Sequence, residues 1–324
     1  MSKVRWGILG AAKIAREWLI PAIQLSSNGI VTAIASRDNE KGVTLQARFN
    51  IPHLYASYES LLDSKEVDAV YIPLPNTLHV EWTHKAIAAG KHVLCEKPLA
   101  MQADEIDGLI AARDQSGLVV GEGFMVVHHP QWQLVQSLIA TGKIGRLQTV
   151  QGSFAYFNAD PDNIRNRNEL GGGALRDIGV YPLVVTRFVT GQEPRVAHAR
   201  INFDPQFGTD RWANCHLQFD DFGLSFYCAT QAARRQQMTF HGDRGWLQLD
   251  APFNAGVYDM ARVKFRANDA ERVEETIFPT VNQYQLLIEN FNAAVMGQST
   301  LAFTLESSRA NQRAIDMLLA ANRA

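Results

Sequence analysis

In the first third of the chain, short runs of apolar residues alternate with stretches whose apolar residues have helical spacing. Runs that are apolar at nearly every position are typical of strands buried on both faces. The expected strands are residues 4–9, 31–36, 67–72, 92–95 and 118–121, and the expected helices are residues 12–25, 41–49, 58–62, 80–89 and 103–115. This alternation predicts a parallel sheet with crossover helices, the doubly wound Rossmann arrangement.

The pattern changes after Gly121. Residues 131–140 have helical spacing, and the following stretches resemble strands, several with apolar and polar residues in alternation: 147–157, 195–203, 213–219, 224–229, 237–241 and 245–249. Such alternation indicates a mostly antiparallel sheet with one face open to water. A last helical stretch, residues 305–321, closes the chain. We therefore expect an α/β Rossmann domain of residues 1–122 and an α+β domain of residues 123–324.

Size and composition limit the possible functions. The chain has 324 residues, 46% of them hydrophobic, which is ample for two packed cores. A net charge of −2 gives no basic stripe, so we expect no nucleic-acid partner. No run approaches the ~20 apolar residues of a membrane span, and Lys13 and Arg16 interrupt the apolar block of a signal peptide. Three cysteines in no paired motif favour the reducing cytoplasm.

The first expected strand leads into a glycine turn, Gly7-x-x-Gly10-x-Ala12, followed by a helix. This is a variant of the dinucleotide-binding fingerprint, in which small residues let backbone N–H groups approach a pyrophosphate at a helix N-terminus. The alternative is that the glycines serve only strand–helix packing. The residues expected to contact the cofactor here are Gly7, Gly10, Ala11, Ala12, Lys13 and Ile14.

The end of the second expected strand bears on the choice between NADP and NAD. An acidic residue that binds the ribose hydroxyls belongs there when the cofactor is NAD, but this chain has Ser36 and Arg37, with Asp38 one position later. A hydroxyl and a guanidinium suit a 2′-phosphate, so NADP is favoured. In the alternative, Arg37 is solvated and Asp38 binds the 2′-hydroxyl of NAD.

Two later strand ends also carry polar residues. In open α/β sheets, ligands bind beyond the carboxyl ends of the strands. The strand at 67–72 is followed by a proline-rich exit, from which we expect four residues to reach the cofactor: Leu74, Pro75, Asn76 and His79.

The next strand end is Glu96-Lys97-Pro98. Proline disfavours the helical conformation of the residue before it, so Pro98 should hold Lys97 extended and restrict its direction. We expect Glu96 and Lys97 to face the cofactor. Taken alone, the pair favours the alternative of a surface ion pair at a strand end.

A glycine-rich segment, residues 171–173, precedes a helical stretch that contains Asp177 and Tyr181. Residues four apart share one face of a helix, and a carboxylate beside a phenol can orient a ligand hydroxyl or a proton donor. A purely structural pair is the alternative. Asn163 and Arg167, just upstream, are further candidates for binding the substrate.

Three motifs in order resemble one family. The glycine turn at residues 7–12, Pro75-Asn76-Thr77-Leu78-His79, and residues 89–99 around Glu96-Lys97-Pro98 are similar to those of the glucose–fructose oxidoreductase/inositol dehydrogenase/rhizopine-catabolism (Gfo/Idh/MocA) family. The resemblance implies an NAD(P)-dependent oxidoreductase of sugars, polyols or related compounds, with Lys97 catalytic.

The second half resembles the same family. Its Gly-Gly-Gly-x-Leu-x-Asp-x-Gly motif is followed by a histidine or tyrosine that serves as acid/base, which maps onto Tyr181. The tyrosine places the chain with glucose–fructose oxidoreductase, xylose dehydrogenases and dimeric dihydrodiol dehydrogenases, and argues against inositol as substrate. One departure is His128-His129-Pro130, where this branch often has an arginine before the proline.

We expect His128 to face the substrate. Adjacent histidines in extended chain point to opposite sides, so His128 and His129 are a poor chelate and no metal is expected. The exposed face of the second-domain sheet is expected to form a homodimer or a higher oligomer.

The working hypothesis is hydride transfer between a nicotinamide and a hydroxyl or carbonyl carbon, with Lys97 and Tyr181 managing the proton and Asp177 holding a substrate hydroxyl. Which of Lys97 and Tyr181 moves the proton stays open. One alternative is an NAD(P)-binding sensor without catalysis. Another is an enzyme of aromatic dihydrodiols or tetrapyrroles, with a large apolar pocket beside Trp132, Phe154, Tyr156 and Phe157.

Overall fold

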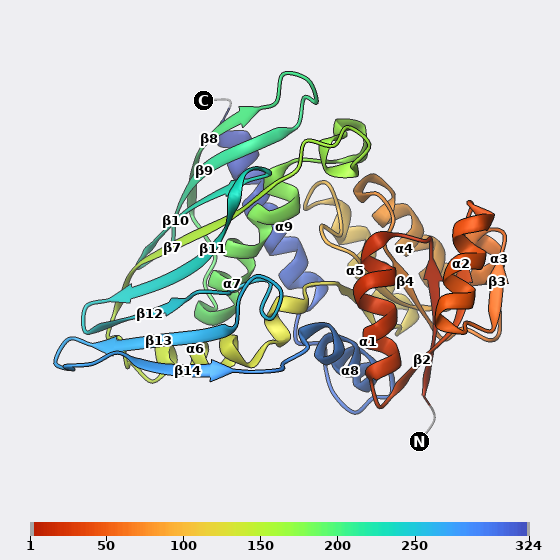
Figure 1. Ribbon diagram of the computed structural model, residues 1–324, viewed down its shortest axis with the longest axis horizontal. Coiled ribbons are helices and arrows are strands. Elements are labelled where there is room, and N and C mark those ends of the chain that lie inside the picture. The colour runs from red at the N-terminus through yellow and green to blue at the C-terminus, as the bar shows by residue number, and fades with distance from the viewer. Residues whose placement is uncertain (1–2, 323–324) are drawn as a thin grey trace. The chain divides into compact units, whose positions relative to one another are not determined.

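A computed structural model describes residues 3–322 of the chain, which form two compact units (Figure 1). The first unit contains the chain up to His128 together with Asn282–Arg309, and the second contains His129–Val281 and the chain from Ala310 onward. No helix of the described residues is long and apolar enough to cross a membrane.

The first unit is built on a six-stranded parallel sheet of order β3-β2-β1-β4-β5-β6. The order reverses on the two sides of β1, so the carboxyl ends of β1 and β4 form the switch point where doubly wound folds bind ligands. The strands are β1 (Val4–Leu9), β2 (Gly29–Ala35), β3 (His53–Tyr55), β4 (Ala69–Ile72), β5 (His92–Cys95) and β6 (Val120–Glu122).

Helices connect these strands in the expected alternation. They are η1 (Ala15–Leu19, a π-helical turn) running into α1 (Ile20–Leu25), then α2 (Asn39–Phe49), α3 (Tyr58–Leu62), the 3₁₀ turn η2 (Asn76–Leu78) running into α4 (His79–Ala88), α5 (Glu105–Ser116), and the 3₁₀ turn η3 (Met125–His128). Strands β4 and β5 are buried at nearly every position, as their continuous apolar runs predict.

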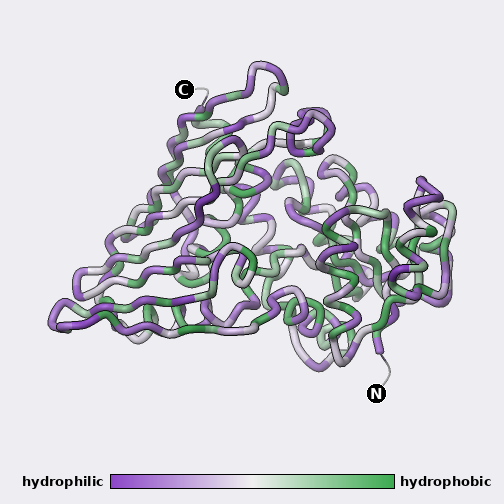
Figure 2. The backbone as a smooth tube through the Cα atoms, in the orientation of Figure 1, coloured by the Kyte–Doolittle hydropathy of each residue, from purple (hydrophilic) through white to green (hydrophobic). Residues whose placement is uncertain are grey.

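The second unit is a mostly antiparallel sheet of order β14-β13-β12-β11-β7-β10-β9-β8, in which β7 and β10 pair in parallel. The strands are β7 (Leu147–Phe157), β8 (Val196–Phe203), β9 (Asp210–Gln218), β10 (Gly223–Ala229), β11 (Gln231–Gly242), β12 (Gly245–Leu249), β13 (Ala261–Ala267) and β14 (Glu274–Phe278). Helices α6 (Pro130–Ala140) and α7 (Val180–Thr190) pack against this sheet. Figure 2 shows hydrophobic and hydrophilic residues alternating along these strands. The predicted fold class is therefore confirmed.

The division of the chain differs from the expected one at two places. The first unit extends to His128, whereas the expected boundary was residue 122. Residues 282–309, expected in the second domain, belong to the first unit. The reason lies in α8 (Gln283–Val295), where Asn292 accepts a hydrogen bond from the indole N–H of Trp6 at 2.9 Å, and Phe291 lies 5.0 Å from Trp6 between ring centroids. Helix α9 (Leu305–Ala321) continues from the first unit into the second.

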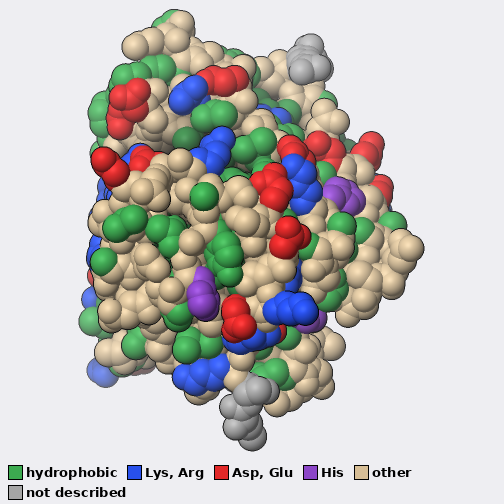
Figure 3. Space-filling view, turned by 90° about the vertical axis from the view of Figure 1, so that its right-hand side faces the viewer, with side chains coloured by type: hydrophobic (Ala, Val, Ile, Leu, Met, Phe, Trp, Pro, Cys, Tyr) green, Lys and Arg blue, Asp and Glu red, His purple; other side chains and the backbone are tan. Residues whose placement is uncertain are grey.

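On the face of the molecule shown in Figure 3, lysines and arginines are interspersed with acidic residues. This distribution agrees with a nearly neutral chain. It gives that face no single-sign field that would concentrate a highly charged polymer.

Candidate active site

The turn after β1 has the geometry that a dinucleotide requires. Gly10 has φ +105°, and a Cβ there would lie 3.3 Å from the Tyr58 hydroxyl and 3.4 Å from Leu74 Cδ2. Its N–H donates to Ala35 O at 2.8 Å, which fixes the turn at the ends of β1 and β2. The chain then enters a helix, whose first N–H groups have no intrahelical partner and favour an anion. This backbone fits the pyrophosphate of NAD or NADP.

The remaining residues of the turn lie in three different environments. Gly7 lies inside β1, and a Cβ there would approach Leu61 Cδ2 to 2.6 Å, so this glycine serves close packing of strand and helix. Lys13 is exposed and lies 3.8 Å from the Glu17 carboxylate. Ala11, Ala12 and Ile14 are half-buried around the helix start, where small or apolar side chains leave the backbone accessible.

At the end of β2, Asp38 is already engaged by its own helix. Its carboxylate accepts from the Lys41 N–H at 3.1 Å, capping α2, and pairs with the Lys41 ammonium at 2.8 Å. The Lys41 contacts lower the pKa of Asp38. The Ser36 hydroxyl donates to Asp38 O at 2.7 Å. Arg37 is exposed, its guanidinium 5.9 Å from the Tyr58 ring centroid, and among residues 3–322 it makes no ion pair.

Four residues in the loop that follows β4 were expected to contact the cofactor, and two of them, Asn76 and His79, differ in exposure. Asn76 is half-exposed at the start of η2, whereas His79 is fully buried. Both ring nitrogens of His79 lie 2.7 Å from backbone oxygens, Nδ1 from Pro98 and Nε2 from Leu74. The His79 side chain therefore has no exposed atom with which to touch a cofactor, contrary to our expectation. Leu74 is buried and Pro75 half-buried.

Glu96 and Lys97 follow β5 as expected, but they are not an isolated surface pair. Glu96 accepts a hydrogen bond from the buried hydroxyl of Tyr71 on β4. Burial and the Glu96 charge raise the pKa of Tyr71 well above its usual value, so Tyr71 stays a donor. Lys97 is half-exposed, and the Lys97–Pro98 peptide bond is cis. Lys97 also interacts electrostatically with His79 and with Glu122 at the end of β6.

In the second unit, the buried carboxylate of Asp177 is bound by two partly exposed polar side chains. One of its oxygens, Oδ2, accepts from the Tyr156 hydroxyl at 2.6 Å and from Arg165 Nε at 2.8 Å. The Asp177 charge raises the pKa of Arg165 and burial lowers it. The charge has the larger effect, so the pKa of Arg165 lies above its usual value. Burial, and then the Asp177 charge, raise the pKa of Tyr156. Tyr156 and Arg165 thus remain hydrogen-bond donors at any physiological pH.

Tyr181 lies one turn beyond Asp177, at the start of α7. Its ring is almost fully buried, 5.4 Å from Phe154 and 5.6 Å from Phe253 between centroids. Arg165 interacts electrostatically with Tyr181 as well as with Asp177. A cation beside a phenol stabilises the phenolate. The arrangement can therefore hold a ligand hydroxyl and assist a proton transfer at Tyr181.

The arginine that contacts Asp177 is not the one that the sequence singled out. Arg167 is exposed and pairs with Glu169 at 2.7 Å, whereas Arg165 reaches Asp177. Asn163 accepts from the Arg165 N–H at 3.1 Å and caps the short 3₁₀ turn η4 (Ile164–Asn166). The sequence gives little indication that Arg165 contacts Asp177, because an irregular loop has no periodicity that assigns its side chains to one face.

The three glycines hold this loop against the helix. A Cβ on Gly172 would lie 2.4 Å from Arg165 O, and one on Gly173, at φ +122°, would lie 1.8 Å from Asp210 Oδ1. The buried Asp210 carboxylate accepts from the Leu175 N–H at 2.6 Å and caps the helix that carries Asp177 and Tyr181. Burial raises the pKa of Asp210 to about 6.

The two histidines before α6 differ in role. His129 is fully buried, and its Nδ1 accepts from the Gln131 N–H, which caps α6. His128 is half-buried, and burial lowers the pKa of each ring to about 4, so both are neutral. Within residues 3–322, no three His, Cys, Asp or Glu side chains are grouped to hold a metal ion.

Comparisons with known proteins agree over nearly the whole chain. Residues 4–124 match the family model "Oxidoreductase family, NAD-binding Rossmann fold", and residues 132–248 match "GFO/IDH/MocA C-terminal domain". The uncharacterized oxidoreductase ORF334 of Rhizobium meliloti is 40% identical over 98% of this chain and 96% of its own. D-xylose 1-dehydrogenase (NADP(+)) 2 of Haloferax volcanii is 33% identical over 97% of this chain and 95% of its own.

Solved structures are also similar. KijD10, a 3-ketoreductase from Actinomadura kijaniata in complex with NADP and TDP-benzene, has a TM-score of 0.90 and 30% identity, covering 99% of this chain and 98% of that one. Other similar structures are variants of KijD10 with one tyrosine or one lysine replaced.

Proposed function

Because this chain belongs to the Gfo/Idh/MocA family of NAD(P)-dependent oxidoreductases, we propose that it transfers a hydride between NADP and a carbonyl or hydroxyl carbon of a sugar or a nucleotide-linked sugar. The family resemblance and the enzyme class predicted from the motifs are confirmed. The non-catalytic sensor is not favoured, since similar proteins are dehydrogenases and reductases. Their substrates, xylose and TDP-linked sugars, are the basis for the proposed substrate class.

The pairing of Lys97 with Tyr181 carries the proposal. They are 84 residues apart, and the same separation lies between the lysine and the tyrosine that were replaced in the KijD10 variants. A lysine and a tyrosine at the same spacing in a similar protein support equivalent roles. We assign Lys97 and Tyr181 to the proton transfer that accompanies hydride transfer.

In the direction of reduction, the carbonyl carbon gains a hydride and its oxygen gains a proton. The bound nicotinamide supplies the hydride. Tyr181 supplies the proton from its hydroxyl, Arg165 stabilises the phenolate that forms, and Lys97 is assigned to assist the same proton transfer. In oxidation the same groups work in reverse, with the phenolate removing the hydroxyl proton.

Asp177 is proposed to accept a hydrogen bond from a second hydroxyl of the substrate. Its Oδ2 is held by Tyr156 and Arg165, which fixes the carboxylate in one orientation. A fixed acceptor orients a polyhydroxylated substrate at little entropic cost on binding. Asn163 is assigned to support this loop, because it caps the turn before Arg165.

NADP rather than NAD is proposed because of the end of β2. The Asp38 carboxylate is engaged by Lys41, which leaves the exposed guanidinium of Arg37 for a 2′-phosphate.

Replacing Arg37 with alanine should raise KM for NADP by about 10- to 100-fold, the loss expected for a charge-assisted hydrogen bond. KM for NAD should change little. Arg48→Ala, which removes another exposed arginine whose guanidinium lies beside an aromatic ring, is the matched control. Equal losses with the two cofactors in Arg37→Ala would argue against a phosphate contact.

The substrate class is tested by initial rates of nicotinamide oxidation and reduction with keto sugars, nucleotide-linked keto sugars, aldoses and aromatic dihydrodiols. The proposal predicts turnover with one of the sugar classes. The aromatic alternative has less support, since Trp132 is fully buried with its N–H donating to Pro252 O and Tyr156 is bound to Asp177. Turnover of dihydrodiols alone would reject the sugar assignment.

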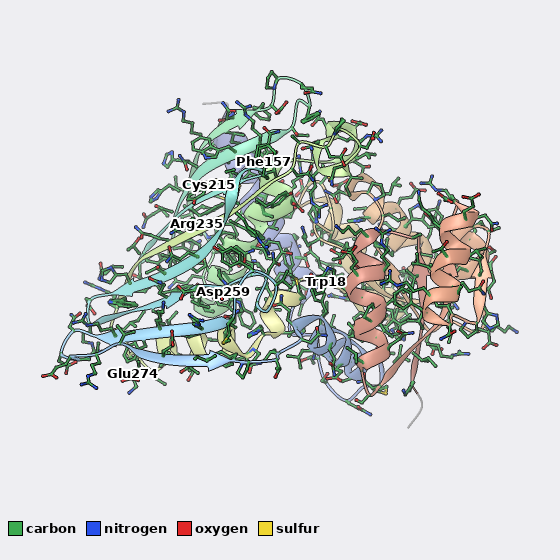
Figure 4. The ribbon with its side chains drawn as sticks, viewed as in Figure 1. Trp18, Phe157, Cys215, Arg235, Asp259 and Glu274 are labelled. Atoms are coloured by element: carbon green, nitrogen blue, oxygen red, sulfur yellow. The ribbon has the colours of Figure 1, made fainter. Side chains whose placement is uncertain are left out.

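The open face of the eight-stranded sheet is proposed to bind a second copy of the chain. It contains a hollow of about 390 Å³ whose lining includes Ser153, Tyr227 and Arg235 from β7, β10 and β11 (Figure 4 labels Arg235). The lining also includes Cys215 and Phe226, so polar and apolar side chains lie together in it. Such a mixed surface is typical of the interfaces through which protein chains associate.

Sedimentation velocity should therefore show a dimer, and Arg235→Glu should shift it toward monomer. Lys65→Glu, on the first unit, makes the same charge change and should leave the dimer intact. A monomeric wild type would contradict this assignment.

We also assign the protein to the cytoplasm. Its three cysteines, Cys95, Cys215 and Cys228, are buried and free. Free thiols persist in a reducing compartment.

A further inference from the structure

The peptide group that joins Pro98 and Leu99, one residue beyond Lys97, is held at both of its polar ends by buried side chains. The carbonyl oxygen of Pro98 lies 2.7 Å from His79 Nδ1. The N–H of Leu99, on the other side of the same peptide bond, donates to Glu122 Oε1 at 2.8 Å. His79 is fully buried and Glu122 is 5% exposed. The C=O and N–H of a peptide point in opposite directions, so the two side chains hold it from opposite sides.

These side chains come from the elements that flank Lys97 in the sheet. His79 begins α4, which follows β4, and Glu122 ends β6. Strands β4 and β6 pair with β5 on its two sides, and Lys97 follows β5. The hydrogen bonds therefore tie the Lys97 loop to both neighbouring strands, and Pro98 and Leu99 are themselves buried.

We propose that His79 and Glu122 are positioning residues that fix the Pro98–Leu99 peptide group and, through it, the direction of Lys97. The inference rests on the proposed role of Lys97 in proton transfer. Neither residue is assigned contact with substrate or cofactor.

The proposal specifies which ring nitrogen of His79 carries the proton. Burial lowers the pKa of His79, so the ring is neutral and has a single N–H. Both oxygens near the ring, from Pro98 and Leu74, can only accept. The Leu99 N–H at the other end of the Pro98 peptide donates to a carboxyl group, which polarises the Pro98 carbonyl and makes it the stronger acceptor. The Nδ1–H tautomer, donating to Pro98, follows.

The hydrogen bond from the Leu99 N–H requires an oxygen of Glu122 but not its negative charge. Burial raises the pKa of Glu122 to about 7, so neutral and ionised forms coexist near neutral pH. Either form presents an oxygen to the Leu99 N–H. A glutamine at this position keeps that oxygen, whereas an alanine removes it.

Two pairs of variants test the proposal. Asn places an amide N–H near the position of Nδ1 and Gln near that of Nε2, so His79→Asn keeps the bond to Pro98 and His79→Gln loses it. We expect His79→Gln and Glu122→Ala to lower kcat by about 10- to 100-fold, as for a reacting group displaced by up to 1 Å. Their KM for NADP, and the dissociation constant for NADPH measured by its fluorescence, should change little. His79→Asn and Glu122→Gln should retain most of the activity.

The opposite results would overturn the proposal. A kcat that is unchanged in folded His79→Gln and Glu122→Ala, or a loss that Glu122→Gln does not rescue, would leave these residues with a structural role only. If the disruptive variants do not fold, ¹⁵N NMR of the histidines in the wild-type protein, assigned by the signal lost in His79→Asn, still decides. An Nδ1–H tautomer of His79 supports the proposal, and an Nε2–H tautomer contradicts it.

The NMR measurement also separates this proposal from the proposed function. It needs no substrate, so it can succeed or fail whether or not a sugar is turned over. Lys97→Met provides the corresponding activity control. If that variant is fully active, the proposed role of Lys97 fails, while the tautomer of His79 is unaffected.

Discussion

Replacing Tyr181 with phenylalanine should lower kcat for hydride transfer by about 10²- to 10⁴-fold, the usual contribution of a positioned acid or base. The phenyl ring can keep the contacts with Phe154 and Phe253, so the loss should reflect the missing hydroxyl rather than packing. Lys97→Met, which keeps the length of the side chain and removes its charge, should cause a loss of the same order. Stopped-flow measurement of nicotinamide absorbance checks both variants.

The matched control is Tyr227→Phe. Tyr227 is a half-buried tyrosine of β10 that lines the hollow on the open face of the sheet, and its hydroxyl has no assigned role in the chemistry. Its loss should leave kcat within the range of the wild type. Full activity in Tyr181→Phe would remove Tyr181 from the proton transfer, and full activity in Lys97→Met would remove Lys97.

Gly173→Ala should lower the free energy of unfolding by about 2–5 kcal/mol, from backbone strain together with a steric clash. Gly173 has φ +122°, and an added Cβ would lie 1.8 Å from Asp210 Oδ1. Relief of that clash would displace the carboxylate that caps the helix carrying Asp177 and Tyr181. Activity should therefore fall in the protein that still folds. Urea unfolding followed by circular dichroism measures the stability.

Gly191→Ala is the control for the effect of positive φ alone. Gly191 ends α7 at φ +66°, and a Cβ there would have no neighbour within 4 Å. Its replacement should lower the free energy of unfolding by only about 1 kcal/mol. Equal losses in the two variants would mean that the approach of Asp210 does not determine the effect at Gly173.

The elements of the first unit could be predicted because their burial is encoded locally. Strands covered on both faces must be apolar throughout, and β4 and β5 are. Strand and helix alternate with short connections, so the sheet follows from the order of the elements. The return of α8 to the first unit could not be predicted. It depends on a contact between Trp6 and Asn292, which are 286 residues apart.

The positions of the candidate site residues in the chain were easier to predict than the groups that their side chains contact. The chain positions of Lys97, Asp177 and Tyr181 follow from motifs at the ends of regular elements. His79 was expected at the cofactor because it ends a polar strand exit, yet its ring is turned into the protein toward Pro98 and Leu74. A sequence identifies where a side chain is attached but not the direction in which an irregular segment points it.

Gly7 and Arg165 illustrate the same limit. Glycine is required both for tight turns and for close packing, and only the 2.6 Å approach of Leu61 shows that Gly7 belongs to the second case. Arg165 and Arg167 are two positions apart in a loop of 3₁₀ turns, where no periodicity indicates which one faces Asp177.

Transfer of deuterium from the nicotinamide to the sugar tests the central claim most directly. NADPH labelled with deuterium at C4 would be incubated with the enzyme and a keto sugar, and the product analysed by mass spectrometry. The account predicts one deuterium on the carbon that was the carbonyl, with NADPH preferred over NADH and the transfer strongly slowed in Tyr181→Phe. NADPH that binds tightly but passes no deuterium to any keto sugar or aldose would contradict it and restore the non-catalytic sensor.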